Sequence, residues 1–319
     1  MDSAEHAQLL RQVRLALQQA DYPAAVASLE KAAAAASAAG DTVGAGRHLG
    51  NLALIYHQRL QQPDVALRYF EQALIIARAD GDRLTEDGIL GNMGSILREQ
   101  GRYDEATNLL YQALLIAQEI GDVRGRGIWL SNLGLVYDDL RRFSEAIEVH
   151  KEAVAVARLL HDQRGLAGRL GNLGNSYLSA GQHTEALKCF HEAAALYREM
   201  GEKEAAALRL GIIGNIYSEL GRSAPSEFEA RMCFDLAVDV YRDTLALAQE
   251  LGDVAAEAEL MSSLGNVYGN MGDYARAVEH FTASYNLFAQ LGLRDRLPHL
   301  QRNIDLAAAY RDGGVNNAP

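Results

Sequence analysis

The chain has 319 residues, of which 49% are hydrophobic and 23% are charged, and its formal net charge is −12. No apolar run reaches the roughly 18 to 20 residues of a membrane-spanning helix, which excludes a transmembrane span. The acidic charge argues against nucleic acid and anionic membranes as main partners, because it repels phosphate groups on average. The first residues lack the apolar core of a signal peptide, and we expect a cytoplasmic protein.

A unit of about 40 residues recurs along the chain. Runs such as NLGLVY and NLGNSY mark its first half, an Ala marks its second half, and a Gly-Asp-type turn separates neighbouring units. These turns stand at Gly40-Asp41, Gly81-Asp82, Gly121-Asp122, His161-Asp162, Gly201-Glu202 and Gly252-Asp253. They follow one another at steps of 40 or 41 residues, except for one step of 51. We therefore predict seven units, the sixth of which carries an insertion of 11 residues.

Each unit resolves into two helices. Over 123–140 and 143–160 the apolar residues recur mostly at steps of three and four, the period of one helical face. Gly at the turns supplies the positive φ that often ends a helix, and the acidic residue after it begins the next helix, where the dipole favours negative charge. The predicted hairpins cover about 3–39, 42–80, 83–120, 123–160, 163–200, 203–251 and 253–291. A capping helix over 294–311 completes one domain, 1–312, before a disordered tail, 313–319.

Glycine also recurs inside the first helix of five units, where it costs about 1 kcal/mol relative to Ala. These glycines are Gly94, Gly134, Gly174, Gly214 and Gly265. Something must offset that cost, and we expect close approach to the small residue of the second helix. That residue is Ala106, Ala146, Ala186, Ala237 or Ala277.

This pattern of residues resembles the tetratricopeptide repeat. A Tyr follows the helix Gly or Ala by three residues, and an apolar residue follows the Ala of the second helix by four. The Tyr residues are Tyr56, Tyr137, Tyr177, Tyr217 and Tyr268, and the apolar residues include Phe70, Leu110, Phe190, Tyr241 and Phe281. Leu97 and His150 depart from the pattern and are expected to loosen their local packing. The 40-residue period is similar to the branch with longer helices, which includes kinesin light chain and LGN/Pins-type repeats.

The resemblance implies an all-α, right-handed α-solenoid of about seven helical hairpins, with the first helix of each hairpin on the concave side. It also implies that two positions of that helix face the groove, and seven of these twelve residues are Asn. They are Asn51, Asn92, Asn132, Asn172, Asn175, Asn215 and Asn266, and Ile212 and Ser263 are among the other five residues. A carboxamide both donates and accepts, so a ladder of Asn can bind the backbone of an extended peptide. The alternative is that these Asn bridge neighbouring helices and stiffen the stack.

The charge of the groove stays open. Arg47 precedes Asn51 by one turn, where the resemblance implies a ligand-binding Arg, and Arg169 and Arg209 occupy related positions in later units. Acidic residues fall on or beside the same face, namely Glu99, Asp139, Glu219 and Glu259. The insertion over 222–240 has an apolar side, which either packs over the adjacent hairpin or offers a surface for a partner or for self-association.

We find no sign of catalysis in the sequence. It has no GxxxxGK[ST] phosphate loop, and His191-Glu192 lacks the second His of a metalloprotease helix. Cys189 and Cys233 are too few and too far apart for a disulfide framework or a zinc site. We therefore predict a non-catalytic scaffold without cofactor or metal, which binds a protein or peptide partner in its groove. The alternative is a regulatory sensor that changes shape when it binds a short signal peptide.

Overall fold

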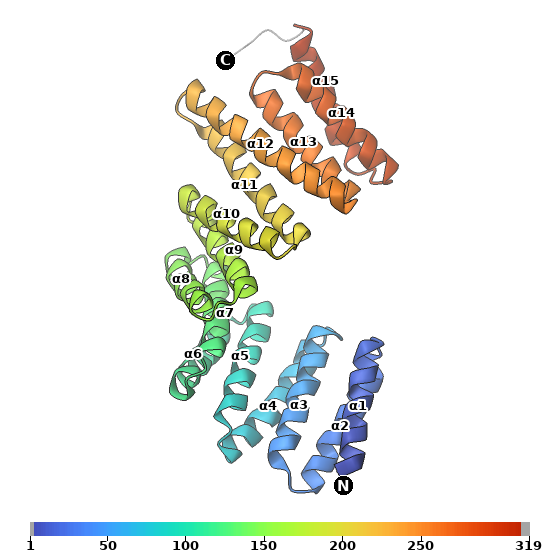
Figure 1. Ribbon diagram of the computed structural model, residues 1–319, viewed down its shortest axis with the longest axis vertical. Coiled ribbons are helices and arrows are strands. Elements are labelled where there is room, and N and C mark those ends of the chain that lie inside the picture. Colours follow the sequence, from blue (N-terminus) through green and yellow to red (C-terminus); the bar gives the residue numbers. More distant parts are fainter. Residues whose placement is uncertain (1–2, 314–319) are drawn as a thin grey trace. The chain divides into compact units, whose positions relative to one another are not determined.

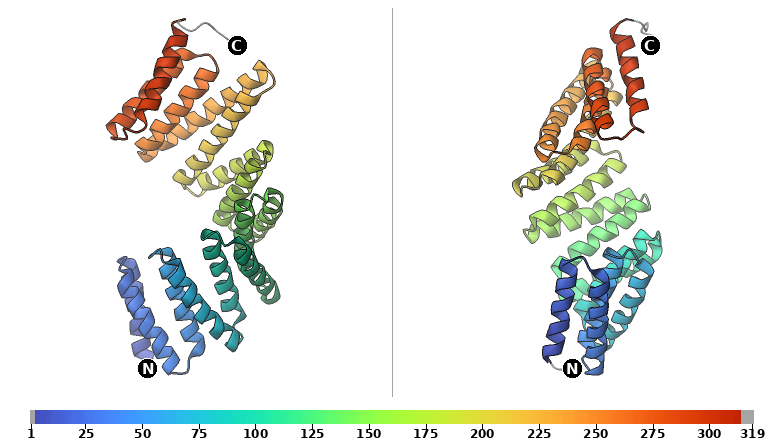
Figure 2. Two further views of the ribbon diagram at one scale, coloured as in Figure 1. Left: turned by 180° about the vertical axis from the view of Figure 1, so that it is seen from behind. Right: turned by 90° about the vertical axis from the view of Figure 1, so that its right-hand side faces the viewer.

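The computed structural model describes residues 3–313, and every regular element in that range is an α-helix. Within each of two compact parts of the chain, helices that follow one another lie side by side and antiparallel (Figures 1 and 2). The contacts divide the chain between Asp162 and Gln163 into two compact units, called here the first and second units. None of the helices in the described range is long and apolar enough to cross a membrane.

The first unit holds eight helices. They are α1 (Ser3–Gln18), α2 (Tyr22–Ala38), α3 (Thr42–Gln58), α4 (Pro63–Asp80), α5 (Arg83–Glu99), α6 (Tyr103–Ile120), α7 (Val123–Asp139) and α8 (Phe143–Leu159). The odd-numbered A helices and the even-numbered B helices share a core in which Phe70, Leu110 and Leu133 are fully buried. Since α3 also touches α5, and α5 touches α7, the A helices form a layer of their own within this unit.

The second unit holds seven helices among the described residues. They are α9 (Gln163–Ser179), α10 (His183–Glu199), α11 (Lys203–Ser223), α12 (Glu227–Leu251), α13 (Val254–Asn270), α14 (Tyr274–Gln290) and α15 (Leu297–Arg311). Its largest buried side chains include Phe190, Ile213 and Tyr268. The final helix begins at Leu297, three residues after the predicted start, and has Pro298 in its first turn, where the missing N–H costs least. Apart from Gly313, the predicted disordered tail lies outside the described residues.

The helix ends follow from the turn residues. Gly81, Gly121 and Gly252 adopt φ values of 67° to 72° at the ends of their helices. The Asp after each of them does more than the expected dipole interaction, because its carboxylate caps the helix. Asp122 accepts a hydrogen bond from the Gly125 amide at 2.9 Å. Asp41, Asp82 and Asp253 each likewise accept one from the backbone amide three residues later. Local chemistry therefore fixes these four hairpin boundaries.

The interior glycines make room mainly for a different residue from the one predicted. A Cβ on Gly174 would lie 2.9 Å from the ring of Phe190, and a Cβ on Gly265 would lie 2.7 Å from the ring of Phe281. At Gly94 the expected close approach to helix B does occur, with the Ala106 carbonyl oxygen 3.3 Å from that position, but the Leu110 side chain is closer still. The glycines thus offset their cost by admitting the large side chain four residues after each Ala.

His150 takes this same place in α8. It is completely buried over Gly134, and its Nε2 lies 3.1 Å from a carboxylate oxygen of Asp138. A polar ring therefore fills a position that is apolar in the neighbouring repeats, and this hydrogen bond satisfies one of its two buried ring nitrogens. Leu97, the other departure from the pattern, is also buried.

The insertion extends both helices of one hairpin. Helix α11 continues to Ser223, and α12, at 25 residues, begins at Glu227. Phe234 packs inward against Gly221, but Phe228, Met232 and Leu236, spaced four residues apart, are exposed on the outer side of α12. The apolar side of the insertion is therefore only partly used in packing.

Candidate functional site

The predicted groove residues lie on the A helices, and several are held by hydrogen bonds within the chain. Half-buried Asn92 donates to the carbonyl of Gly88 on its own helix at 2.7 Å. Asn132 on α7 donates to the Ser95 hydroxyl on α5, also at 2.7 Å. That second bond connects two A helices, as the bridging alternative requires.

In the second unit, Asn215 on α11 accepts a hydrogen bond from the Tyr241 hydroxyl at 2.6 Å. Burial raises the pKa of Tyr241 to about 12, so this hydroxyl keeps its proton and remains a donor at neutral pH. Asn172 on α9 is half-buried, and its backbone carbonyl accepts from the Ser176 hydroxyl at 3.1 Å.

The remaining three candidates are exposed. They are Asn51 on α3, Asn175 on α9 and Asn266 on α13. Asn266 lines a cavity of about 280 Å³ between α13, α14 and α15, together with Asn303 and Tyr310. The predicted Asn set thus includes carboxamides that the chain uses itself and exposed carboxamides, and Asn215 belongs to both groups.

The charged candidates make contacts within their own unit. Arg47, though largely exposed, lies 3.5 Å from Asp82 on the next A helix. Arg209 on α11 is half-buried, with its guanidinium 5.9 Å from the centre of the Tyr197 ring, and Arg169 is half-buried on α9. Asp139 and Glu99, expected beside the groove, pair with Arg98 at 2.9 Å and with His57 at 2.7 Å.

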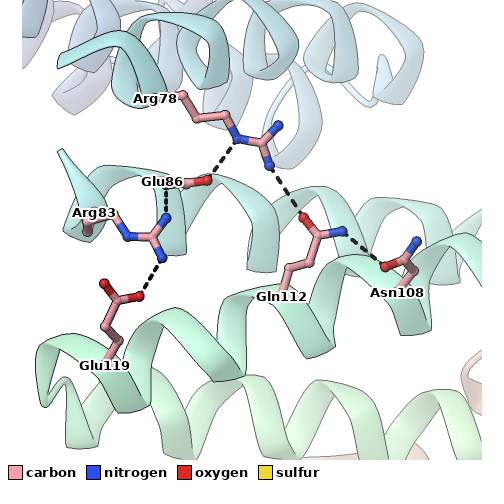
Figure 3. Close-up of polar contacts among 6 residues, drawn as sticks. All are labelled: Arg78, Arg83, Glu86, Asn108, Gln112 and Glu119. Carbon is pink, nitrogen blue, oxygen red and sulfur yellow. Dashed lines mark hydrogen bonds and ion pairs between the residues drawn. The ribbon is translucent and has the colours of Figure 1, made fainter. Parts of the chain in front are cut away.

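A polar network that sequence reasoning missed connects α4, α5 and α6 (Figure 3). Glu86, which is buried, accepts from Arg78 at 2.8 Å and from Arg83 at 2.6 Å. Arg83 reaches on to Glu119 at 2.5 Å, and Arg78 reaches Gln112 at 3.3 Å. A carboxylate this buried needs such partners, so the network fixes the start of α5 against its neighbours.

The only Trp of the chain was also missed. Trp129 on α7 is 6% exposed, its ring covers Gly91 of α5, and its Nε1 donates to Asp87 at 2.7 Å. Burial, assisted by the nearby Asp122 carboxylate, raises the pKa of Asp87 to about 6 against the lowering effect of the indole hydrogen bond. An Asp at a buried position of one A helix, followed by a lone Trp two register positions later in the next A helix, was the available signal.

The second unit has a cavity of about 370 Å³ between α11, α12 and α13. Groove residues predicted from the sequence, Ile212, Asn215 and Ser263, are among those that line it. Its floor includes Tyr241 and Thr244 of α12, both buried. Cavities that bind small molecules or side chains typically measure about 300 to 1,000 Å³, so this one is large enough for a ligand group.

The sequence matches models of the tetratricopeptide repeat in four places. The matched residues are 49–84, 86–158, 166–200 and 258–290. These segments fall in both units and contain most of the A and B helices described above. A comparison with curated proteins finds no significant match.

Solved structures with the same fold cover nearly the whole chain. The apo form of RapI is 14% identical with a TM-score of 0.63, over 90% of this chain and 99% of RapI. A signal transduction ATPase with numerous domains and a tetratricopeptide repeat sensor, from Pyrococcus horikoshii, is 17% identical with a TM-score of 0.65, over 96% of this chain and 44% of that protein. A Rap protein complexed with competence and sporulation factor is 16% identical with a TM-score of 0.53, over 96% of this chain and 98% of that one.

At such low identity these likenesses show the fold alone. The repeat models, the helical hairpins and the solved folds agree with one another. The chain belongs to the tetratricopeptide repeat family.

Proposed function

We propose that this chain is a non-catalytic interaction protein that holds an extended peptide or partner segment against its A helices. The observation that carries the proposal is the recurrence of exposed carboxamides at the two A-helix positions expected to face the groove, Asn51 at the first position and Asn175 and Asn266 at the second. Mid-helix Asn is a mediocre helix former, and these three side chains are free to pair with both N–H and C=O of another backbone. A Rap protein of similar fold forms a complex with competence and sporulation factor, which supports ligand binding by such a fold.

The internal hydrogen bonds divide the work among the Asn. Asn92, Asn132 and Asn215 already bond within the chain, and Asn132 joins two helices. We assign ligand contact first to Asn51, Asn175 and Asn266. Arg47 on α3 and Asn172 and Arg169 on α9 are their neighbours on the same helices, and Arg209 lies on α11. Asn132 we assign to stiffening of the first unit.

The test starts from a phage-displayed library of random 12-residue peptides selected on the full chain. Binding of the selected peptides is then measured by fluorescence anisotropy on the triple variant Asn51→Ala/Asn175→Ala/Asn266→Ala. Each lost hydrogen bond is worth about 1 kcal/mol, so the Kd should rise about tenfold to 100-fold.

Asn286→Ala is the matched control, because Asn286 is also exposed but lies on a B helix. It should leave the Kd unchanged. Unchanged binding by the folded triple variant would refute the assignment of these carboxamides, and failure to select any peptide would refute the proposed function.

The second candidate is a regulatory sensor. The similar Pyrococcus horikoshii protein, whose tetratricopeptide repeats are a sensor, supports it, as does the division of this chain into two compact units. A ligand that binds one arrangement of two bodies more tightly shifts the population toward it. Small-angle scattering with and without a selected peptide separates the two candidates. A change in radius of gyration when the peptide is added supports the sensor. Identical scattering curves with and without the peptide support the scaffold.

A further inference from the structure

Neighbouring A helices meet at a repeated slot. On one side of the slot is a glycine that lies nine residues after the capping residue of its A helix. On the other side is a side chain of the next A helix, seven residues after that helix's capping residue. Three such pairs are Gly91 with Trp129, Gly171 with Arg209, and Gly211 with Leu260.

The first two slots are closed by the chain's own side chains. A Cβ on Gly91 would lie 2.3 Å from the Trp129 ring, and a Cβ on Gly171 would lie 2.8 Å from a terminal nitrogen of Arg209. The backbone of these A helices is therefore spaced to admit a large planar group between them. The Trp129 slot demonstrates that an indole fits there almost completely buried.

The third slot is open. A Cβ on Gly211 would have no atom within 4 Å, and Leu260 is too short to reach across. This space is part of the cavity of about 370 Å³ between α11, α12 and α13. Ala207 occupies the register that Asp87 occupies in the first unit, five residues after the capping residue, so no carboxylate stands here at the position that binds the indole N–H of Trp129. An aromatic ring would be held here mainly by apolar contact.

The rim of this slot is acidic. Glu204, Asp253 and Glu259 line it, and none of the described residues that line it is basic. Arg296 approaches Glu259 at 3.6 Å, but both side chains are more than half exposed, so the pair screens the rim weakly. A cationic group beside the entering ring would be attracted to these carboxylates.

We propose that the slot between α11 and α13 takes an aromatic side chain of a bound peptide, flanked by Lys or Arg. The proposal rests on the proposed function, because Ile212, Asn215 and Ser263 put the slot on the face assigned to peptide binding. The ligand thereby supplies the aromatic ring that fills the slot in the second unit, as Trp129 fills the slot in the first.

The probes are fluorescein-labelled peptides of sequence Gly-Gly-Lys-X-Lys-Gly-Gly, with Trp or Ala as X, and a third in which Glu replaces both Lys around Trp. Anisotropy titrations of the full chain should give a Kd about tenfold or more lower for Trp than for Ala. The Glu-flanked peptide should bind more weakly than the Lys-flanked one. Glu204→Gln/Glu259→Gln should reduce that difference by about threefold.

Leu260→Trp closes the slot as Trp129 closes its own, and it should abolish the preference for Trp over Ala. Gly211→Leu fills the same space from the opposite wall and serves if Leu260→Trp fails to fold. Leu236→Trp is the matched control, since Leu236 is an exposed position on α12 outside the cavity, and it should retain the preference.

Peptides that bind without distinguishing Trp from Ala, or a preference that survives in folded Leu260→Trp, would overturn the slot while leaving the proposed function intact. If neither these probes nor any library peptide binds, both fail.

Discussion

Two pairs of neighbouring A helices share the same arrangement of backbone and glycine, but the slot is filled in one pair and empty in the other. Between α5 and α7 the slot at Gly91 is closed by Trp129, whose indole is hydrogen-bonded to Asp87. Between α11 and α13 the slot at Gly211 faces Leu260, and a cavity remains. The helices and the glycine are alike, so a single side chain decides whether a repeat packs as core or stays open. In a repeat protein, an inward-facing position of this kind can pass from stability to binding by one substitution.

The largest expected effect comes from emptying the closed slot. Trp129→Ala removes a buried indole and leaves a buried carboxyl without its partner, so the free energy of unfolding should fall by about 3 to 5 kcal/mol. Urea denaturation followed by circular dichroism measures it. Indole added to the variant should restore part of the loss by occupying the space, as benzene does in apolar cavities. A loss of less than about 1 kcal/mol would mean that Trp129 is not what closes the slot.

The next effect depends on pH. Because the pKa of Asp87 is raised to about 6 in the folded chain from about 3.9 unfolded, the folded state binds more protons between these values. Its stability should therefore fall as the pH rises from about 4 through about 6, by about 3 kcal/mol in total. Asp87→Asn can still accept from Trp129 and should lack this component. The difference between the urea profiles of the two proteins isolates it, and parallel profiles would contradict the raised pKa.

The smallest effects come from one matched pair of substitutions. Gly91→Ala drives a methyl group into the Trp129 ring and should cost about 1 to 3 kcal/mol. Gly211→Ala meets no atom and should gain up to about 1 kcal/mol from helix propensity. The Tm of each variant, measured by thermal unfolding, reports how tightly its slot is packed. Equal shifts in Tm would show that the slots do not differ in packing.

Local sequence patterns were enough to predict the helical hairpins, because helix ends depend on residues that are neighbours in the chain. Gly121 and Asp122, for example, end one helix and cap the next. Local sequence patterns were insufficient to predict contacts between repeats. Nothing local in α7 indicates that Trp129 would reach an Asp 42 residues earlier. Likewise, the periodic Asn pattern was visible, but only the structure separates Asn132, which bonds Ser95, from exposed Asn175.

The interior glycines teach the same lesson at closer range. The sequence predicted that they admit a neighbouring helix, and the structure replaces the expected Ala with the large residue four positions later. A small residue indicates that another group packs closely against it, but it does not indicate which group. At Gly134 that occupant is His150, whose hydrogen bond to Asp138 could not be read from helical periodicity.

Within each unit, a helix packs chiefly against its neighbours along the chain, and this has a kinetic consequence. Short loops close quickly, and any hairpin can nucleate folding before its neighbours do. Amide protons should accordingly exchange with solvent in blocks of a few helices rather than all together. A peptide seated over α11 to α13 would slow exchange in that block and leave the amides of α3 to α6 at their original rates.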